Sequence, residues 1–297
     1  MDHQEEFRRA ALEAGIPDDE ISRFAQHLRL TIGLSAGGAG TVVGHLGGLP
    51  RLPVDTPWPS AGDAPLPLLL SVDCAALPRI DGFPLPADGT LLFFVDQEKD
   101  HEDTSGSHAR VVHVPHGTET VLAEAPDPSW AREPADVTAA LGAELPLWLQ
   151  EGDEDEDWHE FWEDLEWDDM SPFQQRLAQY MEDELPHLDD LRTLAHGLWP
   201  SGGGIVLGGY VDHEVIGHLA EQTLAGREKE GEIPPIPIAQ WPTHLEKETH
   251  RLATEWISLA AQGRSYEEYC TSFVIRHDDL AALRLDKALP MTRFEAP

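Results

Sequence analysis

The segment from Gly44 to Asp96 places the strongest constraint on what this chain can fold into. It reads GHLGGLPRLPVDTPWPSAGDAPLPLLLSVDCAALPRIDGFPLPADGTLLFFVD, in which Gly and Pro turns separate two short apolar runs. The runs, Leu66 to Val72 and Thr90 to Val95, have the length of β-strands and are bounded by turn residues. Arg110 to Val114 adds the alternation of a half-buried strand. Residues 31–125 are therefore predicted to form a sheet.

Helical patterns flank this segment on both sides. Residues 1–30 show apolar groups at helical spacing, broken at Gly15-Ile16-Pro17, and predict two amphipathic helices. Residues 126–200 predict a connector with a short helix, then an acidic helical insertion. Further helix is predicted from Pro172 to Leu198, with an interruption at Pro186.

Residues 201–297 return to strand-like patterns. The run IVLGGYV follows Gly202-Gly203-Gly204, and Thr271 to Ile275 is predicted as the final strand. Between them, Leu245 to Leu259 has helical periodicity over part of its length. The order of helices, sheet, helices and sheet predicts an α+β fold in one compact unit, with mixed or antiparallel sheet halves and flanking helices.

The second half also repeats short sequence features of the first half in the same order. Such an internal duplication would place two similar sheets about a pseudo-twofold axis, and a cleft between them would be the default ligand site. The matching segments are Gly47-Gly48-Leu49 with Gly208-Gly209-Tyr210, Leu68-Leu69-Leu70 with Leu259-Ala260-Ala261, and Phe93-Phe94-Val95 with Phe273-Val274-Ile275.

The charge balance restricts the classes of partner. The chain carries 55 acidic against 20 basic residues, a formal charge of -35 at pH 7. Such a field repels nucleic-acid phosphates and anionic membrane surfaces, since affinity for phosphates comes mainly from Lys and Arg. A basic protein would be attracted, although a solvated acidic surface that serves solubility alone explains the same composition.

Cysteine content and hydropathy bear on the compartment. Cys74 and Cys270 are too few and too far apart for a disulfide framework or a paired redox motif. The first residues, MDHQEEFRRAALEAG, lack the pattern of a signal peptide, and no apolar run reaches the length of a membrane span. We therefore expect a soluble cytoplasmic protein.

Several motifs carry a family resemblance. GGLPRLP, Trp58-Pro59, PLPLLLSVDCAALP and GTLLFFVD resemble the YwqG-like family, domain of unknown function 1963. LGGYVDHE and SFVIRHDDLAALRLDKA resemble the closing motifs of the same family. The resemblance covers about residues 45 to 288 and implies an α+β fold with two related halves and no settled activity. Relatives beside secreted-toxin genes hint at immunity or partner-binding roles.

The acidic insertion contains one apolar stripe. Residues 151–169 include twelve Asp or Glu and no Lys or Arg, yet four large apolar groups recur at helical spacing. Two interpretations remain open: the stripe packs on the protein's own core, or it is a docking surface for a basic protein partner. The four residues are Trp158, Phe161, Trp162 and Leu165.

Candidate chemistry is sparse. His213-Glu214 and His218 resemble the zincin pattern HExxH, but the two histidines are five residues apart instead of four, which turns their rings about 100° from each other on a helix. They are candidate ligands for a divalent metal only in the alternative that the protein is an enzyme. Surface location explains the histidines at 101, 108, 113 and 116 at least as well as metal binding.

Four aspartates at predicted strand ends are the candidates for a ligand cleft. Asp73, Asp96, Asp278 and Asp279 could hold a cation or perform acid/base chemistry, or they could cap the helical turns that follow. No catalytic residues or cofactor are predicted. The sequence favours a non-catalytic protein-binding factor that uses an acidic surface, with immunity or regulation as its role. A metal-dependent enzyme or a small-ligand-binding protein with a cleft between the halves is the alternative.

Overall fold

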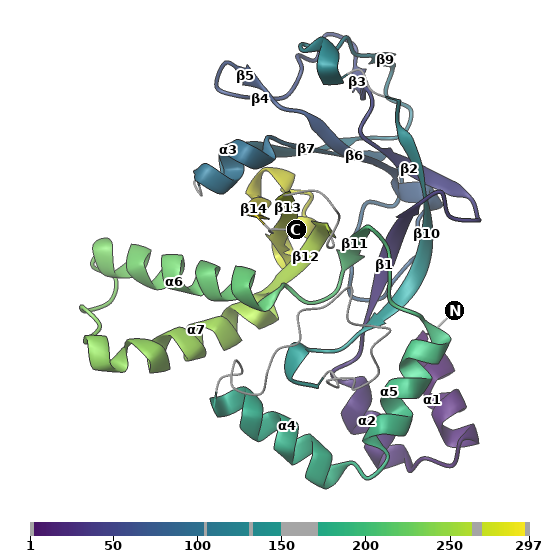
Figure 1. Cartoon of the computed structure of the whole chain (residues 1–297), viewed down its shortest axis with the longest axis vertical. Coiled ribbons are helices and arrows are strands. Elements are labelled where there is room, and N and C mark those ends of the chain that lie inside the picture. The colour runs from purple at the N-terminus through teal and green to yellow at the C-terminus, as the bar shows by residue number, and fades with distance from the viewer. Residues whose placement is uncertain (1–2, 104–105, 131–132, 150–171, 263–268, 295–297) are drawn as a thin grey trace.

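The computed structural model describes residues 3–103, 106–130, 133–149, 172–262 and 269–294. The helices of this part of the chain lie at its start, in its middle and after several strands (Figure 1). They are α1 (His3–Glu13), α2 (Asp18–Ala25), α3 (Gln97–Glu102), α4 (Pro172–Glu184), α5 (Leu188–Leu198), α6 (His213–Lys229), α7 (Trp241–Glu255) and α8 (His277–Ala281).

The strands form one large antiparallel sheet and two small two-stranded sheets. The large sheet has ten strands in the order β14-β13-β12-β11-β1-β10-β2-β6-β7-β8, while β3 pairs with β9 and β4 with β5. The strands are β1 (Arg29–Ala36), β2 (Val42–Leu46), β3 (Arg51–Pro53), β4 (Ser60–Ala61), β5 (Ala64–Pro65), β6 (Leu68–Asp73), β7 (Thr90–Val95), β8 (Ala109–Val114), β9 (Thr120–Leu122), β10 (Ala135–Glu144), β11 (Ile205–Gly208), β12 (Trp256–Gln262), β13 (Tyr269–Arg276) and β14 (Leu289–Phe294).

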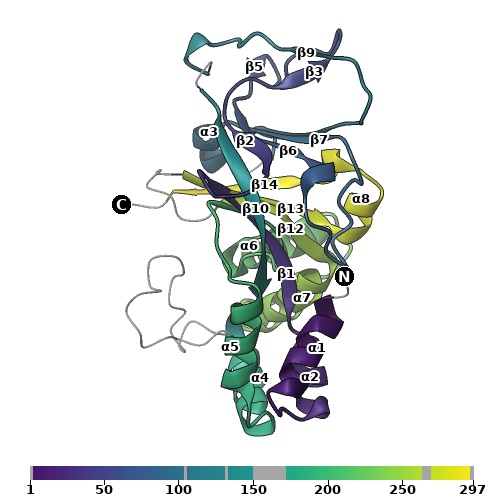
Figure 2. The same ribbon diagram turned by 90° about the vertical axis from the view of Figure 1, so that its right-hand side faces the viewer.

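The α+β class is confirmed, and the strands of both halves of the chain belong to one ten-stranded antiparallel sheet. β1 and β10 pair along eight residues, from Arg29 opposite Glu144 to Ala36 opposite Val137, and so join the two halves in the middle of one sheet. Figure 2 shows these two strands side by side along the molecule. The three pairs of matching segments lie on β2, β6 and β7 and on β11, β12 and β13, or in the turns that follow β2 and β11.

The sheet has two arms on either side of the central pair β1 and β10: the first arm is β2, β6, β7 and β8, and the second arm is β11, β12, β13 and β14. The sheet curves so that strands from the two arms face each other across a shared core (Figure 1). The rings of Phe93 on β7 and Phe273 on β13 meet edge to face with centroids 5.2 Å apart. The core that contains them is made of buried apolar side chains from both arms. Successive residues of β7 point to opposite sides, since Leu92 and Phe94 belong to a separate cluster beneath β3. Coverage on both faces explains why these strands are uninterrupted apolar runs.

The polar contacts of α3 also link the two arms. Gln97 donates from Nε2 to Oε1 of Gln262 at 2.9 Å and to Oγ1 of Thr271 at 3.0 Å. Asp100 is buried, and its Oδ2 accepts a hydrogen bond from Oγ1 of Thr292 at 2.7 Å. Helix α3 follows β7 in the chain, so these hydrogen bonds link the first arm to β12, β13 and β14.

Strand β10 corrects the prediction of a connector with a short helix before the acidic insertion. Its sequence, ADVTAALGAE, is rich in Ala, which favours helix in isolation. Here the backbone instead pairs on both sides, with β1 and with β2, and the small side chains permit close approach at the centre of the sheet. Long-range pairing has therefore overridden local propensity.

The N-terminal helices form a layer with α5 at one end of the sheet (Figure 2). Phe7 and Phe24 stack with ring centroids 5.6 Å apart, and the cluster extends to Leu191 and Trp199. These helices were predicted from sequence, and so was the break near Pro186, which separates α4 from α5. The layer closes one side of a cavity that is described below.

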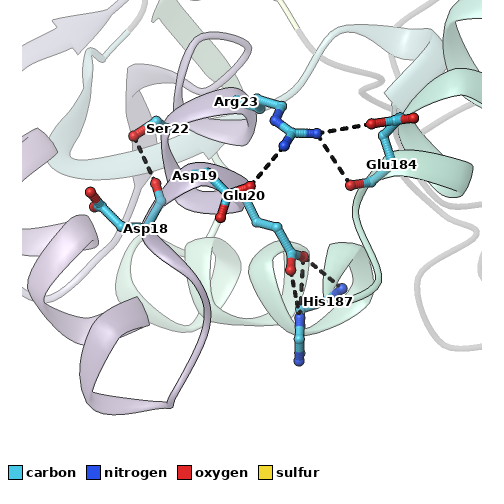
Figure 3. Close-up of polar contacts among 7 residues, drawn as sticks. All are labelled: Asp18, Asp19, Glu20, Ser22, Arg23, Glu184 and His187. Atoms are coloured by element: carbon cyan, nitrogen blue, oxygen red, sulfur yellow. Dashed lines mark hydrogen bonds and ion pairs between the residues drawn. The ribbon is translucent and has the colours of Figure 1, made fainter.

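A polar junction holds α2 against the turn between α4 and α5 (Figure 3). The buried Glu20 accepts hydrogen bonds at 3.1 Å from the backbone N–H of His187 and from its Nδ1. Arg23 bridges Asp19 at 2.7 Å and Glu184 at 3.2 Å on the exposed side of the same junction. The buried contacts fix the position of α2, whereas the exposed ion pairs add little stability.

The helices α6 and α7 pack on the outer face of the second arm (Figure 1). Their apolar residues Val215, Leu219 and Leu252 meet Trp256 and Val274 in a third cluster. Val274 points to these helices while its neighbours Phe273 and Ile275 point to the shared core. In the described ranges we find no helix whose length and hydropathy would suit a membrane span.

Candidate functional site

A cavity of about 250 Å³ lies where the N-terminal helices meet the second arm of the sheet. Its apolar wall is made by Phe7 of α1, Ile80 and Phe83 of the loop before β7, Trp199 after α5 and Ile257 of β12. We call this space the N-terminal cavity. It collects residues from both halves of the chain, so it forms only when the whole sheet is folded.

The cationic group of the cavity is Arg29, the first residue of β1. Its guanidinium lies over the ring of Tyr210, 3.8 Å from the centroid, and Nη1 is 3.4 Å from the carbonyl oxygen of Gly209. Stacking on an aromatic face holds a guanidinium while leaving its N–H edge available. Within the described ranges, no acidic side chain forms an ion pair with Arg29.

A partly buried carboxylate stands opposite Arg29 in the sheet. Glu144 is the cross-strand partner of Arg29 in the register of β1 and β10. Its Oε2 accepts a hydrogen bond from the backbone N–H of Tyr210 at 3.0 Å. Burial raises the pKa of Glu144 to about 7, and the nearby Asp212 adds to the effect, whereas Arg29 and the Tyr210 N–H oppose it.

The glycine turn after β11 makes room for this carboxylate. Gly209 has a φ of +83°, and a Cβ at this position would overlap the Glu144 carboxylate. A residue with a side chain is thus excluded here both by backbone conformation and by contact. The turn places Tyr210 so that its hydroxyl donates to the carbonyl of His27 at 2.9 Å. The motif LGGYVDHE therefore builds one wall of the cavity.

The polar lining also includes Gln4, Asp81 and two histidines. His277, at the start of α8, is half-buried, and its pKa is lowered by burial and by the charge of Arg29, against an opposing effect of Asp278. His3 stands edge to face with Trp199, at 5.9 Å between ring centroids, and its Nδ1 is 3.6 Å from Oε2 of Glu6. The guanidinium, the two imidazoles and the apolar wall suit a ligand with an anionic group and an apolar body, and Asp81 adds one carboxylate to the same lining.

The aspartates predicted for a ligand cleft do not all come together. Asp73 ends β6 opposite Thr90, whereas Asp96 follows β7 at the other end of the same antiparallel pair. Six strand residues at about 3.3 Å each separate these ends by about 20 Å. Asp73 accepts from the N–H of Ala75 at 3.0 Å, and Asp96 accepts from the N–H of Lys99 at 3.2 Å. Both carboxylates therefore cap the helical turn that follows.

The other two aspartates lie in the first turn of α8, directly after the cavity residue His277. Asp278 is exposed, and its charge acts on the imidazole of His277. Asp279 accepts from Nε of Arg284 at 2.6 Å. Of the four predicted cleft residues, this pair alone neighbours a residue of the N-terminal cavity.

The residues of the metal alternative occupy the start of α6. Glu214 pairs with Arg293, 2.6 Å from Nη1, while Nε2 of His218 is 2.8 Å from Nε2 of Gln222. His213 is the first residue of the helix, after the capping Asp212. A search of the described part of the chain finds no group of three or more His, Cys, Asp or Glu side chains placed to hold a metal ion.

The apolar stripe of the acidic insertion lies outside the described residues. Trp158, Phe161, Trp162 and Leu165 belong to the range 150–171, so their prediction as a docking surface stays a prediction.

Sequence analysis did not single out Arg29, which lines the cavity, or Glu144, which lies opposite Arg29 in the sheet. Arg29 and Glu144 are far apart in the chain, and only the pairing of β1 with β10 brings them together. Tyr210 was within a motif singled out from the sequence, and the two glycines before it were the available signal.

Comparison with known families agrees with this architecture. Residues 44–292 match the family model described as Domain of unknown function (DUF1963). The chain belongs to the DUF1963 family. The match includes most of β2 through most of β14 and therefore the cavity residues Phe83, Gly209 and His277, whereas Arg29 and the N-terminal helices precede it. No curated protein matches the chain.

Proposed function

We propose that this DUF1963 protein is a non-catalytic binding protein whose N-terminal cavity holds a small molecule with an apolar body and one anionic group. The observation that carries the proposal is Arg29, a cation that lines an apolar cavity and is held by Tyr210 without an ion-pair partner among the described residues. In a chain of formal charge -35, a cavity cation that forms no ion pair with a described residue favours an anionic ligand.

The size of the cavity limits the ligand. Its volume of about 250 Å³ is below the range of about 300–1,000 Å³ for pockets that take drug-sized molecules. The rings of Phe83 and Trp199 favour a flat or short apolar body. Small aromatic or short aliphatic carboxylates meet these requirements.

The test compares carboxylates with their neutral amides. Benzoate, phenylacetate and hexanoate are titrated into the full chain by calorimetry, each alongside its amide. We expect the acids to bind and the amides to bind about 10- to 100-fold more weakly, as for the loss of one charge-assisted contact. Arg29→Gln should abolish the difference, and Arg51→Gln, an exposed arginine on β3, should preserve it. The proposal fails if no acid binds better than its amide, or if Arg29→Gln binds like wild type.

A second candidate function is capture of a basic protein by the acidic surface, in an immunity or regulatory role. The formal charge of -35 supports it, because opposite charge accelerates association. Replacing Trp158 and Trp162 with Ala should weaken partner capture from host lysate and leave the melting temperature unchanged. Loss of folding in that variant would instead assign the stripe to the core.

We also infer an internal duplication and a reducing cytoplasmic location. From the central pair β1 and β10, the sheet continues outward through β11, β12, β13 and β14 on one side and β2, β6, β7 and β8 on the other, each in chain order. A short helix follows the third strand of each series, α8 after β13 and α3 after β7. The two buried cysteines are free thiols, which suits a reducing compartment.

A further inference from the structure

We propose that Glu144 is a positioning residue that couples ligand binding to proton uptake: an anion bound at Arg29 draws a proton onto the Glu144 carboxylate. This inference rests on the proposed function of the N-terminal cavity and adds a regulation that the cavity alone does not require. It is carried by the placement of Arg29 between the cavity and Glu144.

The carboxylate cannot move far from Arg29. It is fixed from one side by the N–H of Tyr210 at 3.0 Å and from another by the turn at Gly209, which it contacts closely. Arg29 stands opposite it in the strand register and is itself stacked on the ring of Tyr210. The charge of Arg29 therefore acts on two anionic positions: through space on the Glu144 carboxylate, with which it forms no ion pair, and on a ligand in the cavity that it lines.

The charges that face Glu144 are few. Arg29 on β1 favours its ionised form, and so does the Tyr210 N–H, whereas Asp212 in the same loop and burial favour its protonated form. These opposing influences leave the carboxyl close to neutrality, so a modest change in the local field shifts its proton occupancy. An anion at Arg29 supplies such a change, because it neutralises the guanidinium that the Glu144 carboxylate relies on.

Thermodynamic linkage gives the direction of the pH effect. If binding takes up a proton, lowering the pH must strengthen binding by the same free energy. Protonation of Glu144 removes the competing negative charge and leaves Arg29 available to the ligand. We expect affinity for an anion to increase about three- to tenfold from pH 8 to pH 6, as for a shift of up to one pKa unit.

The cavity histidines require a matched control. His277 also lines the cavity, and its protonation at low pH would strengthen anion binding with the same sign. Glu144→Gln keeps both histidines and an acceptor for the Tyr210 N–H, but cannot ionise. The difference between wild type and Glu144→Gln therefore isolates the contribution of Glu144.

The experiment is calorimetric titration of benzoate at pH 7.5 in Tris and in bis-Tris buffers, whose ionisation enthalpies differ widely and whose cations do not compete for Arg29. We expect the apparent binding enthalpy of wild type to depend on the buffer, with a fraction of a proton taken up per benzoate bound. Glu144→Gln should lose most of this uptake and bind benzoate more tightly than wild type at pH 8.

Three outcomes are distinguishable. Proton uptake in wild type that is lost in Glu144→Gln supports the inference. Benzoate binding with no uptake, or with equal uptake in both proteins, overturns it and leaves the anion-binding function standing. Failure of benzoate and of the other acids to bind overturns the proposed function, and the inference with it.

Discussion

At the scale of single residues, the turn at Gly209 is the most constrained position near the cavity. Its positive φ of +83° and the contact with Glu144 act together. Gly231 has a similar φ of +76°, but a Cβ there would meet nothing within 4 Å. The two glycines therefore separate the conformational effect from the steric effect.

We predict that Gly209→Ala is more destabilising than Gly231→Ala. The left-handed conformation alone should cost about 1 kcal/mol in either variant. The overlap with the carboxylate should add about 1–3 kcal/mol at position 209 only. Urea denaturation of both variants measures the difference. Equal losses would show that the turn relaxes freely and that the Glu144 contact does not restrict it.

Glu144 itself should make stability depend on pH. Its folded-state pKa of about 7 is above the unfolded value of about 4.3. The folded state thus binds more protons between these values, and stability decreases as the pH rises through this range. The shift corresponds to at most about 4 kcal/mol.

We therefore expect Glu144→Gln to be more stable than wild type by about 1–3 kcal/mol at pH 8 and nearly equal to it at pH 4.5. Chemical denaturation across this pH range checks the prediction. Glu13→Gln, at an exposed position on α1, is the control and should follow wild type throughout. A stability difference that is independent of pH would contradict the assigned ionisation of Glu144.

At the scale of elements, the Glu20 junction determines how the N-terminal layer closes the cavity. Glu20→Ala removes the acceptor for two N–H groups of His187, one of them in the backbone. We expect a loss of about 1–3 kcal/mol together with weaker benzoate binding, because α1 and α2 supply part of the cavity wall. Thermal denaturation and calorimetry measure the two effects.

The control for this junction is Asp19→Ala, which breaks an exposed ion pair with Arg23 on the same helix. Its cost should be less than about 1 kcal/mol, with binding unchanged. If both variants behave alike, the buried hydrogen bonds do not position the layer.

The elements also show how far sequence analysis reaches. The helices of the N-terminal layer and the strands β6, β7 and β8 were predicted because their signals are local: helical spacing, strand-length apolar runs and turn residues. β10 was missed because nothing in an Ala-rich segment identifies a partner far along the chain. The cavity was not predicted either, since Arg29 and Glu144 become neighbours only through the pairing of β1 with β10.

At the scale of the whole molecule, the continuity of the sheet has energetic consequences. The core beneath it contains Leu70 and Phe93 of the first arm and Leu259 and Phe273 of the second arm. A protein with two independent halves would have a core in each. The shared core indicates that the arms lose structure together, and that the cavity between them is lost at the same time.

We predict that Phe273→Ala reduces the hydrogen-exchange protection of β6 and β7 as much as that of β12 and β13. Phe273 is 1% exposed and contacts Phe93, so the cavity left by its truncation opens into both arms. The cost in stability should be about 3–5 kcal/mol. Hydrogen exchange followed by mass spectrometry resolves the four strands separately.

The neighbouring residue provides the control. Val274 is buried on the opposite face of β13 and packs against α6 and α7. Val274→Ala should therefore lower protection mainly in those helices and in β13, and should leave β6 and β7 close to wild type. If Phe273→Ala also spared β6 and β7, the two arms would open independently, and the shared core would not couple the halves. Ligand binding in a cavity built from both arms would then stabilise only the arm that supplies most of its contacts. With coupled arms, as we expect, benzoate should raise protection in β7 and β13 alike.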